Sequence, residues 1–150
     1  MGGGQQQLQQ LSEELQAIDE EIEALQAEID DLQTEQAEID GAIEAIDTLD
    51  TGSTVQVPLG GGAYIRAEIQ DIDEIIVDLG GDFAAEQEAD DAVDALRTKQ
   101  DILDDRIDEV QEEVQELETE SSELEQQAQQ MQQQMQQQQM QQMQGQDDGE

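Results

Sequence analysis

The feature that most constrains this chain is a heptad repeat in its first third. Apolar residues follow one another at alternating steps of three and four, and only Gln36 interrupts the series. The members are Leu8, Leu11, Leu15, Ile18, Ile22, Leu25, Ile29, Leu32, Ile39, Ile43 and Ile46. A stripe with a period of 3.5 residues is typical of a coiled-coil helix, which cannot bury so narrow a stripe by itself. The sequence therefore predicts a helix over residues 5–50 that needs a partner helix.

A second heptad series in the last third of the chain is a candidate for that partner. Its members are Val93, Leu96, Gln100, Leu103, Ile107, Val110, Val114, Leu117, Ser121, Leu124, Ala128, Met131 and Met135. They predict a helix over residues 88–135. Because the linker between the two series is long enough to reverse the chain, an antiparallel helical hairpin is the simplest arrangement. A parallel homodimer through each helix separately is the alternative.

The hairpin arrangement also predicts a register. If Ile46 faces Val93, then Leu8 faces Met131 at the other end. Gln36 and Gln100 then fall in adjacent layers of the seam, where polar residues often fix the alignment of two helices. We expect their two amides to hydrogen-bond to one another.

The linker predicts two β-hairpins over residues 54–86. In each, apolar and polar residues alternate on both sides of a glycine turn, first Gly60 to Gly62 and then Gly80 and Gly81. Two small hairpins bury too little apolar surface to be stable alone, and their free edges can pair with other chains. We expect hairpins of several subunits to close into shared β-barrels. The expected assembly residues are Val55, Val57, Leu59, Ile65, Ile69, Ile76, Val77, Leu79 and Phe83. The predicted fold class is α+β.

The charge is extreme, with 41 acidic and 4 basic residues and a net charge of -37. So few cations argue against binding to nucleic acid or to an anionic membrane surface. The acidic residues are spread over nearly every exposed helical position, which favours adaptation to molar salt over a local binding function. At ~1 M salt the Debye length is about 3 Å, which screens the repulsion between the helices. We therefore expect a protein from a halophile.

No residue pattern in the chain predicts catalysis or a cofactor. Cys and His are absent, which removes disulfides, thiolate metal sites and imidazole chemistry. Asp71, Asp73 and Asp78 lack the glycine and the final acidic residue of a calcium loop, and Gly60 to Gly62 lack the Lys of a phosphate loop. From the missing catalytic patterns we expect that the protein is not an enzyme. The chain has neither an apolar signal core nor a long apolar run, so we expect it to be cytoplasmic.

The central segment carries a resemblance to a known family. Val57-Pro58-Leu59, the glycine turn, Ala63-Tyr64-Ile65-Arg66-Ala67 and Ile76-Val77-Asp78-Leu79-Gly80, set between two coiled-coil helices, resemble archaeal prefoldin, and specifically its alpha subunit. The resemblance implies a hexamer of two alpha and four beta subunits. It also implies an ATP-independent chaperone that holds unfolded polypeptides at the tips of its coiled coils and passes them to a group II chaperonin.

The residues themselves suggest where such a protein holds its clients. In a helical hairpin both chain ends meet at the far tip, where methionine side chains suit irregular apolar surfaces. The expected client-binding residues are Leu8, Leu11, Met131, Met135, Met140 and Met143. Two alternatives remain open. Met131 and Met135 can simply complete the seam, and the whole chain can be a structural coiled-coil spacer. In either case we expect residues 136–150 to form a disordered acidic tail rich in Gln and Met.

Overall fold

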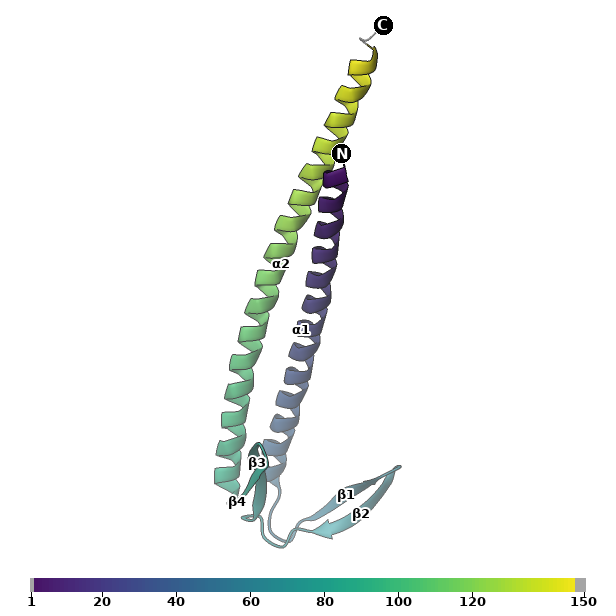
Figure 1. Ribbon diagram of the computed structural model, residues 1–150. Coiled ribbons are helices and arrows are strands. Elements are labelled where there is room, and N and C mark those ends of the chain that lie inside the picture. The colour runs from purple at the N-terminus through teal and green to yellow at the C-terminus, as the bar shows by residue number, and fades with distance from the viewer. Residues whose placement is uncertain (1, 148–150) are drawn as a thin grey trace. The chain divides into compact units, whose positions relative to one another are not determined.

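The computed structural model describes residues 2–147 and contains two long helices and two β-hairpins (Figure 1). Helix α1 spans Gly2–Thr48 and helix α2 spans Ala89–Asp147. Strands β1 (Thr54–Gly60), β2 (Ala63–Glu68), β3 (Ile75–Gly80) and β4 (Phe83–Gln87) lie between them in the chain. The predicted α+β class is confirmed. The chain divides into two compact units, one built from the residues up to Ile29 and from Asp108 onward, and the other from Asp30–Ile107.

In the first unit the core is the seam between the two helices. Val110 is fully buried, and Ile18 and Val114 are each 8% exposed. The other heptad residues of this unit are half-buried, whereas most positions between them are exposed. Gly4 lies beside Met135, as the predicted pairing of Leu8 with Met131 implies.

In the second unit the two helices are antiparallel and their seam contains a polar layer. The side-chain amide of Gln36 donates to Asp104 Oδ1. The side-chain amide of Gln100 donates to Asp40 Oδ1 and, at 3.4 Å, to the backbone carbonyl oxygen of Gln36. The expectation that the two side-chain amides bond to one another is therefore wrong. Each instead binds a carboxylate of the facing helix, because an ionised carboxylate is a stronger acceptor than an amide oxygen.

The two hairpins form separate antiparallel sheets of two strands each. Val57 pairs with Ile65 in the first sheet, and Val77 pairs with Ala85 in the second. Gly61 and Gly62, with φ of 60° and 80°, form the two-residue turn between β1 and β2, for which glycine is favoured because both positions need positive φ. Since each sheet ends at two strands, the expected shared barrel is not closed within a single chain.

Side-chain and backbone hydrogen bonds connect the hairpins to the helices. Gly52 N–H donates to the Ile69 carbonyl at 2.7 Å, and Ile69 N–H donates to the Ser53 carbonyl at 2.9 Å, which extends the ladder of the first hairpin. Asp73 Oδ1 accepts from the Ala89 N–H at 3.4 Å. This carboxylate therefore binds one of the free N–H groups in the first turn of α2.

The ends of the helices differ from their predicted positions. Helix α1 begins at Gly2 instead of residue 5, and α2 continues to Asp147, although residues 136–150 were predicted to be disordered. Residues 148–150 lie outside the described part of the chain. The extension of α2 follows from composition, because Gln and Met are good helix formers and no glycine interrupts the segment before Gly145.

Candidate functional site

The first hairpin exposes much of its apolar face. Val57 is 40% exposed, Ile65 53% and Leu59 66%, while Val55 is half-buried. The register places Val55, Val57 and Ile65 on one face of the sheet, because side chains alternate along a strand and paired residues share a face. Ile69, which follows β2, is half-buried.

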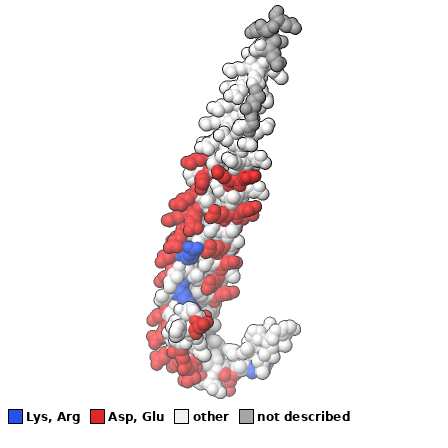
Figure 2. Space-filling view, in the orientation of Figure 1, with Lys and Arg blue, Asp and Glu red and all other residues white. Residues whose placement is uncertain are grey.

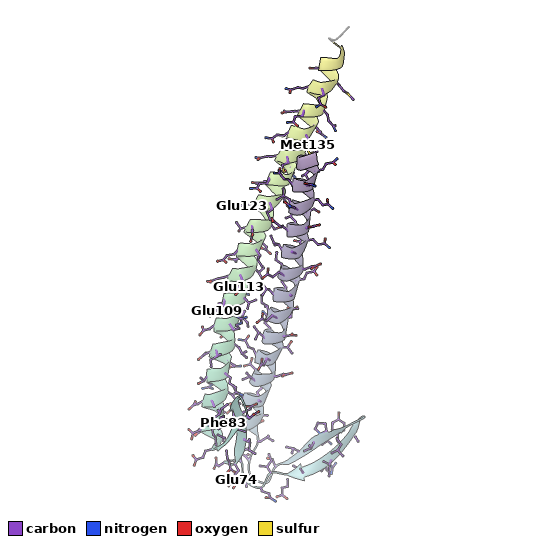
Figure 3. The ribbon with its side chains drawn as sticks, viewed as in Figure 1. Glu74, Phe83, Glu109, Glu113, Glu123 and Met135 are labelled. Carbon is purple, nitrogen blue, oxygen red and sulfur yellow. The ribbon has the colours of Figure 1, made fainter. Side chains whose placement is uncertain are left out.

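The second hairpin is partly covered within the chain. Val77 is only 5% exposed, whereas Leu79 is 52% exposed, Ile76 74% and Phe83 78%. Figure 3 labels Phe83 at the start of β4. Ile76 lies on the face opposite Val77, so apolar side chains occur on both faces of this sheet. Each of the four strands has one partner among the described residues, which leaves one edge of every strand open to another chain.

The tip of the first unit contains a groove of about 640 Å³. Helix α1 contributes Gly3, Gly4, Gln5 and Gln7 to its lining, and α2 contributes Met131 and Met135 with Gln134, Gln138, Gln139 and Gln142. Met135 lies on α2 beside the beginning of α1 (Figure 3). A Cβ atom placed on Gly4 would stand 3.5 Å from Met135 Sδ.

The structure places the six predicted client-binding residues in three settings. Leu8 and Leu11 are half-buried in the seam of α1. Met131 and Met135 are also half-buried, and both line the groove. Met140 and Met143, further along α2, are 69% and 74% exposed.

The tip is also free of charge. No acidic or basic residue occurs before Glu13 or between Glu125 and Asp147. On the face shown in Figure 2, red acidic side chains are spread along the lower part of the helices, and the white stretch of α2 that follows Glu125 shows none. A partner can desolvate an uncharged surface of amide and methionine side chains at lower cost than a surface of carboxylates.

Two acidic residues of the hairpin region take part in turns. Asp71 Oδ1 accepts from the Asp73 N–H and Asp78 Oδ1 accepts from the Gly80 N–H, each at 3.0 Å. Within the described residues, no cluster of three or more His, Cys, Asp or Glu side chains could hold a metal ion. Over the same residues, neither helix has an apolar stretch of the length that crossing a bilayer requires.

Two features of these sites were missed in the sequence. The groove is one. Gly3 and Gly4 remove side chains from the part of α1 that lies beside Met135, but the predicted helix began only at residue 5. The pairing of each seam glutamine with an aspartate was the other, and Asp40 and Asp104 differ in no visible way from the other acidic residues of the helices.

Two long coiled-coil helices joined by two β-hairpins are the architecture of a class of chaperone subunits. Residues 18–142 match the family model described as Prefoldin subunit, and the chain belongs to the prefoldin family. It is 76% identical over 109 residues to the prefoldin subunit alpha of Halorubrum lacusprofundi, a match that covers 73% of this chain and 72% of the relative. It is 79% identical over 105 residues to that of Haloquadratum walsbyi, covering 69% of this chain and 68% of the relative.

A solved structure supports the same conclusion. The chain resembles a subunit of filamentous PFD from Methanocaldococcus jannaschii, determined by cryo-EM, with 26% identity and a TM-score of 0.66. The match covers 75% of this chain and 95% of that chain. The predicted resemblance to an archaeal prefoldin alpha subunit is confirmed, and the relatives from Halorubrum, Haloquadratum and Halobacterium agree with the predicted adaptation to salt. The chain is a prefoldin chaperone subunit, and subunits of this kind form complexes with other prefoldin subunits.

Proposed function

We propose that this chain assembles through its two β-hairpins into a hexamer of two alpha and four beta subunits. The observation that carries the proposal is the exposure of Leu59, Ile76 and Phe83, which are 66%, 74% and 78% exposed in the single chain. Large apolar side chains beside open strand edges are typical of a surface that is covered by another subunit. The remaining assembly residues are Val55, Val57, Ile65, Ile69, Val77 and Leu79.

We further propose that the assembled complex is an ATP-independent holdase. Leu8, Leu11, Met131, Met135, Met140 and Met143 contact the unfolded client at the tips of the coiled coils, and the client then passes to a group II chaperonin. Several arms that bind one client weakly give a high total affinity and still permit release, because each single contact dissociates readily. The uncharged tip, in a chain of net charge -37, supports this location for the client.

Two measurements on the complex with its beta partner in molar KCl test these proposals. The native mass of the complex should correspond to two copies of this chain and four of the partner. A denatured client diluted into the complex without nucleotide should stay soluble, and addition of a group II chaperonin should then release it. A complex of the expected mass that gives no protection from aggregation would favour a structural spacer, and a stable monomer would contradict assembly through the hairpins.

A further inference from the structure

Four of the five methionines lie near the end of α2, in two pairs on different sides of the helix. Met131 and Met135 are half-buried and line the groove beside α1, whereas Met140 and Met143 are 69% and 74% exposed. The inner pair, Met131 and Met135, and the outer pair, Met140 and Met143, lie about 130° apart around the helix axis at 3.6 residues per turn. Figure 1 shows that α2 continues beyond the first residues of α1 in this unit. The outer pair therefore lies on a part of α2 that is open to solvent.

These methionines carry the only sulfur that an oxidant can attack, because the sequence has no cysteine. In the reaction with hydrogen peroxide, the thioether sulfur attacks one peroxide oxygen, so that an S–O bond forms and the O–O bond breaks. The sulfur loses two electrons, and the released hydroxide takes the proton from the transferred oxygen and leaves as water. The product is methionine sulfoxide, which is polar and chiral where the thioether was apolar.

Exposure determines which of the sulfur atoms reacts first, since the oxidant must approach the sulfur closely. Met135 packs against α1, and a Cβ atom placed on Gly4 would stand 3.5 Å from its Sδ. Met140 and Met143 have most of their surface open to solvent. A peroxide in solution should therefore oxidise the outer pair before the inner pair.

The neighbours of the outer pair also suit the oxidised form. Gln136 and Gln144 lie four residues before and after Met140, and positions four apart are neighbours on a helix surface. Gln139 has the same relation to Met143. Each glutamine amide can donate a hydrogen bond to a sulfoxide oxygen, whereas the thioether sulfur is a weak acceptor. Oxidation thus replaces two apolar side chains by polar ones that match the glutamines around them.

Resting on the proposed holdase function, we infer that Met140 and Met143 form a reversible oxidation site, and that a peroxide lowers client capture by converting both to the sulfoxide. The partner for the reverse reaction is a methionine sulfoxide reductase, which removes the oxygen as water while two thiols are oxidised to a disulfide. Two such reductases are needed, one for each epimer of the sulfoxide. The exposure of the outer pair gives these enzymes access to the sulfur atoms.

The first measurement follows the order of oxidation in the full complex with its beta partner in molar KCl. The complex is treated with hydrogen peroxide for increasing times, and tandem mass spectrometry gives the sulfoxide fraction at each methionine. The outer pair should react at least about twofold faster than the inner pair, in line with its greater exposure. Equal rates, or faster reaction of Met131 and Met135, would contradict the assignment of the site.

The second measurement uses two matched double variants. Met140→Leu with Met143→Leu removes the outer pair, and Met131→Leu with Met135→Leu removes the inner pair. Leucine keeps the apolar character, the approximate volume and the helix propensity of methionine. Peroxide is removed before a denatured client is added, and capture is expressed relative to the same variant before treatment. A change in basal capture therefore cancels, and oxidation of the beta partner affects all variants alike.

The relative capture should fall severalfold in the native complex and in the variant that lacks the inner pair. It should stay unchanged in the variant that lacks the outer pair. Incubation of the oxidised native complex with both reductases and a dithiol should restore capture, because the apolar side chains are regained.

Three results would overturn the inference. These are unchanged capture by a native complex in which both outer sulfoxides have formed, equal falls in the two double variants, and sulfoxides that the reductases leave in place. A complex that gives no protection before peroxide is added would contradict the proposed holdase function instead. The order of oxidation is read from mass alone, so the site itself is tested in either case.

Discussion

The exposed Phe83 side chain gives the sharpest test of assembly through the hairpins. Its side chain is 78% exposed in the single chain, compared with 74% for Ile76 and 52% for Leu79 in the same hairpin. An aromatic side chain buries about 150–250 Å² when fully covered, so roughly 120–190 Å² remains for a partner to cover. At about 25 cal/mol per Å² this corresponds to ~3–5 kcal/mol per subunit when the side chain is fully covered, and incomplete coverage lowers the value.

Phe83→Ala removes most of this surface, and because most of the side chain is exposed in the single chain, the change should disturb the β3–β4 hairpin little. A loss of ~2–3 kcal/mol raises the concentration needed for assembly about 30- to 150-fold. Native mass as a function of concentration, measured by light scattering in molar KCl with the beta partner present, gives this midpoint directly. Ile102→Ala is the matched control, because Ile102 is 62% exposed on α2 and lies outside the seam. If the two variants assemble at the same concentration as the native chain, Phe83 is not covered by a partner and the reasoning is refuted.

Three further outcomes are expected. Val110→Ala should lower the free energy of unfolding by about 2 kcal/mol in urea titrations followed by circular dichroism, because Val110 is fully buried, and Gln111→Ala should not. Truncation after Glu125 should leave the number of subunits in the complex unchanged and weaken client capture. Unchanged capture would show that the tip does not bind clients. Dilution to ~0.1 M salt extends the Debye length to about 10 Å, so hydrogen exchange should rise first in residues 13–29 and 108–125, which have no basic residue to offset repulsion. Uniform loss of protection along both helices would contradict that order.

The sequence was a good guide wherever one periodicity dominated. The heptads placed every seam residue from Leu8 to Ile46 correctly as buried or half-buried, because a narrow stripe has only one way to face its partner. Alternation around the glycine turns likewise predicted both hairpins, and Val57 pairs with Ile65 across the first of them in the structure. In both cases the pattern is local, and the structure follows from it without further information.

The sequence was a poor guide where the outcome depended on competition between similar groups. The helix that faces Gln36 is rich in acidic residues, and the bond from Gln36 to Asp104 depends on side-chain geometry that no sequence pattern specifies. The segment after Met135 was ambiguous for another reason. A run of Gln and Met has low complexity, which suggests disorder, and also good helix propensity, which prevails here as far as Asp147.

The bond between Asp73 and Ala89 has a consequence for how the chain folds. A helix usually receives its N-terminal acceptor from the residue just before it, but here the acceptor comes from sixteen positions upstream, on the far side of the whole β3–β4 hairpin. The first turn of α2 can gain this bond only after that hairpin has closed and returned the backbone to Asp73. Pairing of β3 with β4 and capping of the first turn of α2 are therefore coupled, and a chain whose strands fail to pair loses this acceptor at the start of the second helix.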